Sequence, residues 1–341
     1  MPNHLLRIQH FASTSRSRIV TGATILTLVA IGWLFRHLIY TSWTLASLGV
    51  YWSSTADEFV LSKTHDHFDI TFADYDENQL SATPYDDLVP PILHHIVFGK
   101  HGSRWRDESE DAMRSCLDRH PGWQSHIWSE ENASKFVAEK FPELREMWEN
   151  YPYQIQRIDS LRYMVLYEYG GVILDVDLRC KRALGPLRRF SFVAPEAHPT
   201  GFSIGFMMAA KGNSFAGDIV RSLSVHNRQW LGLPYPSVMF STGCHFASVI
   251  HALQPNRTDL KVLPKPMHSL NGPSSTPIFD HLGSSSWHSY DARLITALGN
   301  QANLPVFLVL GVALVLFVGR RVILQCLRKS KPQSEAGVKH H

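Results

Sequence analysis

Cysteine is scarce in this sequence, and no two of the four cysteines form a C-x-x-C pair. The common zinc and dithiol redox motifs are therefore excluded. Charge is also limited, because the net charge is only +3 at pH 7 and the basic residues cluster beside apolar segments. That distribution argues against a nucleic-acid-binding face. No internal repeat or coiled-coil heptad is present, which excludes repeat architectures.

Long apolar runs are few, and the first of them is short for a membrane span. Ile19–Phe35 carries no charge, and Arg36 and His37 can extend it by snorkelling. A cleaved signal peptide is the alternative. The apolar continuation from Leu38 to Trp52, without a clear small-x-small cleavage site, favours a membrane anchor.

A second apolar run, Leu304–Gly319, is followed by two arginines and further apolar residues. Snorkelling arginines would let Leu304–Leu324 span a thin bilayer; a buried core helix is the alternative. Basic residues at both outer flanks predict cytosolic termini and a lumenal middle. The predicted parts are a cytosolic terminus with anchor at 1–52, a lumenal connector at 53–88, a catalytic domain at 89–303, a transmembrane helix at 304–327 and a cytosolic tail at 328–341.

Two N-x-S/T triplets support the lumenal placement, and they predict N-glycosylation at Asn132 and Asn256. Three cysteines also fall in the predicted lumenal part: Cys116, Cys180 and Cys244. One disulfide is compatible with three pairings, and one thiol would remain.

The most informative pattern of the chain ends on two aspartates. An apolar helical pattern leads into Gly170-Gly171, and the apolar run Val172–Leu174 then ends on Asp175 and Asp177. Carboxylates two positions apart share one side of an extended segment. They suit a hard divalent ion such as Mg²⁺ or Mn²⁺ that keeps sites for phosphate. The pattern predicts an enzyme that handles a nucleotide-diphosphate compound.

A lone D-x-D triplet is a weak signal, and a second one, Asp74-Tyr75-Asp76, lies in the acidic stretch Asp66–Asp87. No apolar strand leads to that copy, so we interpret it as a surface loop. Asp175 and Asp177 instead follow a strand, where ligands bind in open α/β sheets. The alternative is a capped helix and a strand whose last residues are merely exposed acids.

Helical and strand patterns alternate from residue 89 onward, which predicts an α/β fold. Strands are predicted at Ile92–Phe98, Ile127–Trp128, Val172–Asp175, Val193–Ala194 and Phe202–Ala209. Helices are predicted at Asp107–His120, Asn132–Lys140, Leu144–Trp148, Ile155–Tyr169 and Asp218–Arg228. The segment 255–287 is rich in Pro, Ser and Gly, which is typical of loops that order over a ligand.

Four motifs in order resemble glycosyltransferase family 32. They are Val89–Gly99, His120–Trp123 with Trp128, Ile158–Tyr163 with Tyr169–Asp177, and His281–Trp287. The resemblance implies a GT-A (Rossmann-like) domain, a GDP-mannose donor, Mn²⁺ or Mg²⁺, and retention of configuration at the sugar carbon. Within the family the chain is most similar to catalytic subunits of fungal mannosyl-inositol-phosphoceramide synthases. That similarity implies an inositol-phosphoceramide acceptor, a Golgi membrane and a small regulatory membrane subunit as partner.

The resemblance also assigns residues. Asp175 and Asp177 are the catalytic candidates; the donor-binding candidates are Asp159, Arg162, Asp175, Ser286 and Trp287; Asp177 is the metal ligand. His281 is added as a second metal candidate. Of the neighbouring His94 and His95, one is expected to face the core and the other to approach the nucleotide, and His94 is taken as donor-binding.

Two stretches depart from the family pattern: Ser203–Gly205, where a polar pair is common, and Thr242–Cys244, where many members read T-G-P. Both bear on the acceptor. The resemblance implies a retaining mannosyltransferase, and the predicted spans favour a lipid acceptor because they would hold the site near a bilayer. The alternatives are a glycoprotein α-mannosyltransferase of the same family and a non-catalytic regulatory membrane subunit.

Overall fold

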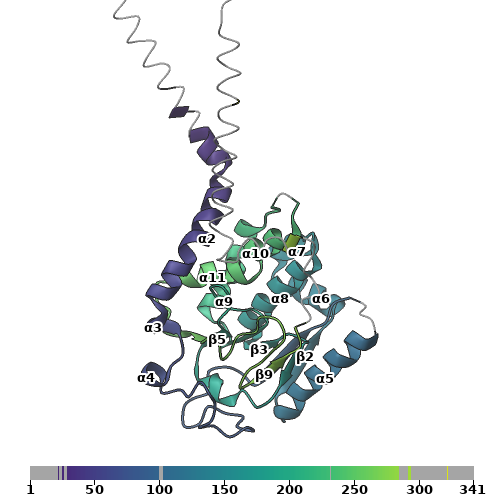
Figure 1. Ribbon diagram of the computed structural model, residues 1–341. Coiled ribbons are helices and arrows are strands. Elements are labelled where there is room, and N and C mark those ends of the chain that lie inside the picture. The colour runs from purple at the N-terminus through teal and green to yellow at the C-terminus, as the bar shows by residue number, and fades with distance from the viewer. Residues whose placement is uncertain are drawn as a thin grey trace, which may run out of the picture. The chain divides into compact units, whose positions relative to one another are not determined.

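A mixed six-stranded sheet organises the fold, with strand order β2-β1-β3-β6-β5-β7 (Figure 1). The strands are β1 Ile92–Ile96, β2 Gln124–Trp128, β3 Gly171–Leu174, β5 Phe192–Pro195, β6 Phe206–Ala209 and β7 Leu260–Leu263. The strands β2, β1 and β3 are parallel, as are β5 and β7, while β6 runs antiparallel to β3 and β5. This largely parallel sheet, flanked by helices, confirms the predicted α/β class.

The computed structural model describes residues 22, 25–26, 29–99, 103–230, 232–283, 291–292 and 321. The helices are α2 Arg36–Ser54, α3 Ala56–Phe59, α4 Lys63–Asp66, α5 Ser103–Arg119, α6 Glu130–Lys140, α7 Pro142–Glu149, α8 Gln154–Tyr169, the 3₁₀ helix η1 Gly185–Arg189, α9 Ser214–His226, α10 Pro234–Ser241 and α11 Cys244–Ala252. A small antiparallel sheet contains β4 Leu178–Cys180, β8 Ser274–Ser275 and β9 Phe279–His281. Both sheets belong to one contact unit, made of residues 1–230 and 236–285.

Alternate residues of the central strands feed two separate cores, as the two-residue period of a strand requires. On β3, Ile173 packs into one apolar cluster, whereas Val172 and Leu174 pack into the other. The first cluster takes in α6 to α9 and α11, and the second takes in Cys116 of α5 and the segment that precedes β1. The sheet is therefore covered on both faces, which explains why its strands are apolar on both sides.

Helix α8 leads into the central strand through two glycines that no other residue can replace without strain. Gly170 and Gly171 have φ of 67° and 96°, values that favour glycine. A Cβ on Gly170 would lie 2.6 Å from the amide nitrogen of Lys211, and one on Gly171 would lie 2.6 Å from the carbonyl oxygen of Ile92. This tight turn lets β3 follow α8 directly and end at Asp175.

The connector of residues 53–88 is polar in sequence, yet it packs closely against the sheet. Phe59, Phe68 and Phe72 have no exposed surface. The Leu61 amide donates to the Val262 carbonyl at 2.9 Å, and Lys261 pairs with Asp66 at 2.6 Å. These few phenylalanines, which lie between acidic residues in the sequence, anchor the segment to the domain by packing into its apolar clusters.

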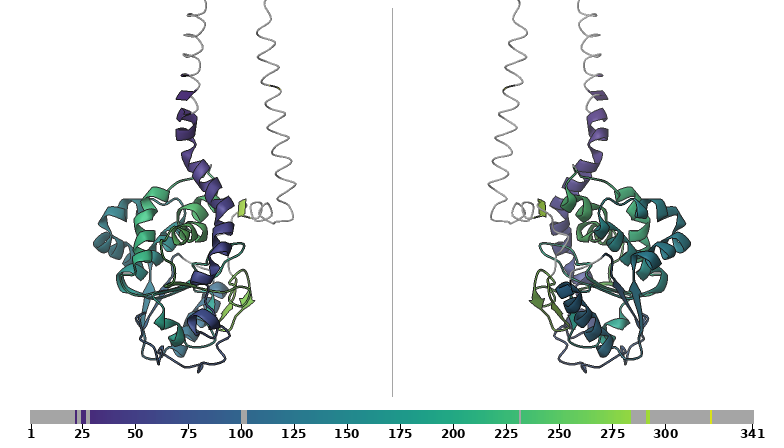
Figure 2. Two further views of the ribbon diagram at one scale, coloured as in Figure 1. Left: turned by 90° about the vertical axis from the view of Figure 1, so that its left-hand side faces the viewer. Right: turned by 90° about the vertical axis from the view of Figure 1, so that its right-hand side faces the viewer.

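Helix α2 lies along the domain and contacts α11 (Figure 2). Its buried residues recur every three or four positions, as expected of one helix face: Thr41, Thr44, Leu48 and Trp52. In the part of the chain with a described conformation, no helix combines the length and apolarity needed to cross a bilayer. Of the predicted spans, 304–324 lies outside the described residues except for residue 321, whereas 19–35 is described at 22, 25–26 and 29–35.

Candidate functional site

The D-x-D pair lies where the sequence places it, directly after β3, and Arg162 of α8 reaches toward it. Arg162 Nη1 donates to Asp175 Oδ1 at 2.6 Å and to the Ile204 carbonyl at 2.8 Å. Its side chain is only 7% exposed. A buried guanidinium fixed by two partners is a rigid support, so Arg162 sets the orientation of the Asp175 carboxylate.

Asp159 is one helical turn before Arg162 and is buried behind it. Its Oδ1 lies 3.7 Å from Arg162 Nε, and its Oδ2 accepts a hydrogen bond from Thr242 Oγ1 at 3.2 Å. Burial raises the pKa of Asp159 to about 7, although the positive charge of Arg162 opposes that rise. At 3% exposure, this carboxyl supports Arg162 from behind.

Asp175 presents the accessible carboxylate of the network, with 34% of its side chain exposed. Partial burial raises its pKa to about 6, again against the effect of Arg162. Its amide donates to the Gly205 carbonyl at 2.8 Å, and a Cβ on Gly205 would lie only 2.7 Å from Asp175 Oδ2. The absence of a side chain at residue 205 therefore leaves the space that this carboxylate occupies.

Asp177 meets His281 because β4 and β9 pair in antiparallel fashion, with Leu178 opposite His281. His281 Nε2 lies 3.3 Å from Asp177 Oδ2, while Nδ1 donates to the Gly272 carbonyl at 2.7 Å. Burial disfavours the charged imidazole, but the hydrogen bond and charge of Asp177 outweigh it and raise the pKa of His281.

A divalent cation fits this pair. Because Nδ1 donates to the Gly272 carbonyl, loss of the Nε2 proton that faces Asp177 would leave a lone pair at Nε2, an arrangement typical of metal-binding histidines. Asp177 adds a carboxylate oxygen, which Mg²⁺ and Mn²⁺ both accept. Within the described residues no group of three or more His, Cys, Asp or Glu side chains could enclose an ion, so phosphate oxygens or water would complete the shell.

The structure does not support His94 as a donor-binding residue. Its side chain is fully buried in β1; Nε2 donates to the Gly170 carbonyl at 2.9 Å, and Nδ1 accepts from Trp128 Nε1 at 3.3 Å. Both ring nitrogens are used, and burial lowers its pKa to about 3. His94 is a neutral core residue, and His95 is equally buried. The other two donor candidates, Ser286 and Trp287, lie outside the described residues.

Two supporting positions were missed by sequence reasoning, and both lie in the stretches that depart from the family pattern. Thr242 bonds Asp159 through its hydroxyl, and its carbonyl accepts from Tyr163 Oη at 2.6 Å. Gly205 makes room for Asp175. Thr242 contributes a hydroxyl and a backbone carbonyl, and Gly205 contributes only the absence of a side chain. Neither role can be predicted from the residue type alone.

Other acids that the sequence offers have structural roles. Glu196, the carboxylate that directly follows β5, pairs with Lys265 Nζ at 3.1 Å and accepts from the Lys265 amide. Asp74 of the second D-x-D pairs with Lys63 at the surface, as the loop interpretation predicts.

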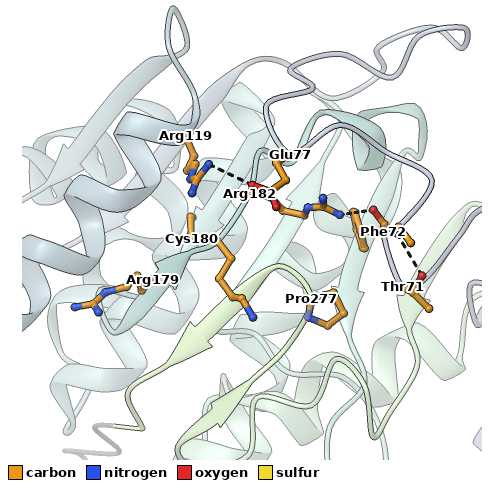
Figure 3. A pocket seen from close by; sticks show the side chains of 10 residues that line it. Thr71, Phe72, Glu77, Arg119, Arg179, Cys180, Arg182 and Pro277 are labelled. Atoms are coloured by element: carbon orange, nitrogen blue, oxygen red, sulfur yellow. Dashed lines mark hydrogen bonds and ion pairs between the residues drawn. The ribbon is translucent and has the colours of Figure 1, made fainter.

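A cavity of about 520 Å³ lies beside β4, lined by residues of α5, β4 and the connector (Figure 3). Three of its four cations have partners: Arg119 lies 3.8 Å from Glu77, Arg182 donates to the Phe72 carbonyl, and Lys181 donates to the Thr276 carbonyl. Cys180, at the cavity wall, forms a disulfide with Cys116 of α5, and among the described cysteines Cys244 is left as a free thiol. We interpret this region as packing between the connector and β4.

Both predicted glycosylation asparagines are exposed, in different settings. Asn132 is in the first turn of α6, and its amide donates to the Ile127 carbonyl at 2.9 Å. Asn256 is in the loop before β7, where its Oδ1 accepts from the Thr258 amide and hydroxyl. The loop position is the more accessible of the two for modification.

Comparisons with known proteins agree with this geometry. Residues 106–193 match the family described as "Glycosyltransferase sugar-binding region containing DXD motif". An inositol phosphoceramide mannosyltransferase 1 of Schizosaccharomyces pombe is 30% identical over 283 residues, 79% of this chain and 84% of that protein. A mannosyl phosphorylinositol ceramide synthase of Saccharomyces cerevisiae is 32% identical over 225 residues, 64% of this chain and 57% of that protein.

Among solved structures, a PaToxG glycosyltransferase aligns over 61% of this chain and 77% of its own, with 16% identity and a TM-score of 0.35. This structural similarity is low, whereas the sequence similarity extends over most of the chain. The matched family region contains both aspartates of the motif, and the relative from Schizosaccharomyces pombe is covered over most of its length. The chain therefore belongs to the DXD-containing glycosyltransferase family that includes the fungal inositol phosphoceramide mannosyltransferases, and it is a glycosyltransferase.

Proposed function

We propose that this glycosyltransferase moves mannose from GDP-mannose to inositol phosphoceramide, with retention of configuration. The relatives named above are mannosyltransferases of this lipid by their names. The observation that carries the proposal is the convergence of Arg162–Asp175 and Asp177–His281 at the end of β3. Ligands bind at this end of strands in α/β sheets.

Each side chain has a distinct task in this proposal. Asp177 and His281 would hold Mn²⁺ or Mg²⁺, which would supply positive charge against the diphosphate of the leaving group. Asp175, oriented by Arg162, contacts the hydroxyl groups of the mannose or the ribose. Ser286 and Trp287 remain proposed donor contacts that close the site against water, because hydrolysis of the donor competes with transfer.

Retention is assigned to attack by the acceptor hydroxyl on the same face from which GDP departs. Glu196 is bound to Lys265 through both carboxylate oxygens, so it is a poor candidate for a covalent nucleophile. The developing positive charge on the sugar then lies next to Asp175, the accessible carboxylate of the network.

The proposed location is the Golgi membrane, with predicted spans on both sides of a lumenal catalytic domain. Only 16 residues separate the predicted clamp at Trp287 from the apolar run at Leu304, and this short separation supports a membrane acceptor. A small regulatory membrane subunit is a proposed partner.

The second D-x-D of the chain provides a matched control for the test. We expect Asp177→Asn to lower transfer of labelled mannose to inositol phosphoceramide by roughly 100-fold or more, because it removes a metal ligand. Asp74→Asn makes the same chemical change at the exposed Lys63 pair and should leave transfer unchanged.

The assay uses membranes that contain the full chain and labelled GDP-mannose, with and without inositol phosphoceramide, and with EDTA followed by Mn²⁺. Folding of each variant is checked by thermal unfolding. A folded, active Asp177→Asn enzyme would refute the metal assignment. Transfer to glycoprotein in place of the lipid would refute the acceptor and support a glycoprotein α-mannosyltransferase. Failure to bind GDP at all would support a non-catalytic subunit.

A further inference from the structure

A second cavity of about 330 Å³ lies between the N-terminal end of α2 and the segment that runs from the end of α9 into α10. We call it the α2 cleft. Its lining includes six basic or aromatic residues: Arg36, His37, Tyr40, His226, Arg228 and Trp230. It shares no residue with the site at the end of β3. Its position on α2 places it next to the part of the chain from which the predicted membrane anchor extends.

Basic groups converge in the α2 cleft without acidic partners. His37 lies within electrostatic reach of Arg36, His226 and Arg228, and none of the described residues that line the cleft is acidic. The buried Nε2 of His37 has no hydrogen-bond partner in the described part of the chain. Because like charges held close together repel, an anion bound in the cleft would offset the charges of Arg36 and Arg228.

The cavity beside β4 shows the contrast (Figure 3). There Glu77 lies in the lining and balances Arg119, and Lys181 and Arg182 are bonded to backbone carbonyls. In the α2 cleft, Arg36 also donates to a backbone carbonyl, that of Trp33 at 2.7 Å, and lies over the Trp33 ring, but no acid is among the described lining residues. The charge of the α2 cleft is therefore available to a ligand.

Apolar and aromatic groups surround this charge. Tyr40 lies beside the His226 ring, with centroids 6.1 Å apart, and Trp230 meets Phe240 edge-on at 5.6 Å. Large apolar side chains near the cleft are exposed: Leu38 50%, Ile39 57%, Trp43 65% and Val225 63%. Basic residues next to exposed apolar and aromatic side chains are typical of surfaces that lie at a membrane interface.

We propose that the α2 cleft binds the phosphate of an anionic lipid headgroup, with the exposed side of α2 against the acyl chains. Arg36 and Arg228 bind the phosphate, and His37 Nε2 takes part in the same contact. In this proposal the lipid held here positions the catalytic domain on the leaflet and is distinct from the molecule that accepts mannose. This docking role goes beyond the proposed transfer reaction.

The test measures binding of short-chain lipids to the purified full chain in detergent by native mass spectrometry. The probes are dioctanoyl phosphatidylinositol, dioctanoyl phosphatidylcholine and soluble inositol phosphate. We expect phosphatidylinositol to bind most tightly, and the double variant Arg36→Gln/Arg228→Gln to weaken it at least tenfold. Arg221→Gln is the matched control, because it removes one exposed charge of α9 that is paired with Asp218.

Thermal unfolding and GDP affinity of the double variant confirm that it is folded, and the single variants Arg36→Gln and Arg228→Gln replace it if it is not. Unchanged phosphatidylinositol affinity in the folded variants would overturn the proposal. A protein partner would then be the favoured occupant of this surface. So would an equal loss in Arg221→Gln, or equal affinity for phosphatidylcholine. Equally tight binding of soluble inositol phosphate would overturn the membrane source. None of these outcomes depends on mannose transfer, so failure here is distinct from failure of the proposed function.

Discussion

Alanine at residue 205 should disable the enzyme by moving one carboxylate. Gly205 does not have a positive φ, so its backbone accepts a side chain. The added Cβ would, however, lie 2.7 Å from Asp175 Oδ2. Contacts of this kind settle at roughly 3.5 Å, so the carboxylate has to move by roughly 0.8 Å. That movement disturbs the 2.6 Å contact between Asp175 Oδ1 and Arg162 Nη1.

The size of the effect follows from that movement. A misplacement of about 1 Å in a positioned group can reduce a rate by about 100-fold. We therefore expect Gly205→Ala to lower kcat/KM for mannose transfer by roughly 10- to 100-fold, or about 1.4–2.7 kcal/mol in transition-state free energy. Stability should change less, by about 1 kcal/mol, because the Asp175 side chain is one-third exposed and can yield toward solvent.

The measurement is a donor titration of membrane-reconstituted enzyme, with thermal unfolding in parallel. Gly49→Ala is the matched control, because its Cβ would meet only Thr200 Oγ1 at an ordinary 3.6 Å; its kinetics should equal those of the wild type. If Gly205→Ala retained wild-type kcat/KM while folded, the position of Asp175 would not limit transfer, and the reasoning about Arg162 would fail with it.

Three further predictions concern the disulfide, acid stability and the cation. The Cys116–Cys180 bond closes a separation of 64 residues, so Cys116→Ala/Cys180→Ala should lower the free energy of unfolding by about 4 kcal/mol in urea denaturation, well beyond the effect of Cys244→Ala. Burial lowers the pKa of five histidines from 6.5 to about 3 or 4: His94, His95, His120, His245 and His251. Below pH 6.5 the unfolded chain binds protons that the folded chain does not, so stability should fall as pH drops from 6.5 toward 4, by up to about 1.4 kcal/mol per pH unit for each histidine; a constant urea midpoint between pH 7.5 and 5 would contradict this. GDP should bind at least tenfold more tightly with Mn²⁺ than with EDTA by calorimetry, and Asp177→Asn should remove the difference.

Local pattern was sufficient to predict the centre of the fold. The helix predicted over Ile155–Tyr169 is observed as Gln154–Tyr169, and the strand after the glycines is Gly171–Leu174. Here the helical period, the two glycines and the apolar run all agree on one structure, so no distant contact is needed to decide between alternatives. The predicted placement of Asp175 at a strand end followed from the same signals.

The predictions that failed depend on contacts between distant segments. The segment 255–287 was predicted as loops, but it forms β7, β8 and β9. Strands of two to four residues have too little periodicity to detect, and β9 exists because it pairs with β4, about 100 residues earlier. His94 was misassigned for a related reason: its two hydrogen-bond partners, Gly170 and Trp128, are not its neighbours in sequence.

The charge balance of the site explains why the Asp177–His281 pair matters for donor binding. Asp159, Asp175 and Asp177 contribute three carboxyls, against one guanidinium from Arg162 and the imidazole of His281. Burial raises the pKa values of Asp159 and Asp175, and the neighbouring carboxylates add to the rise. A diphosphate would add further negative charge, so without a counterion the site would repel the donor it is proposed to bind. The pairing of β4 with β9 places an imidazole beside Asp177 at the point where a divalent cation could offset both the carboxylates and the diphosphate. Donor binding and ion binding are therefore expected to be coupled at this edge of the sheet.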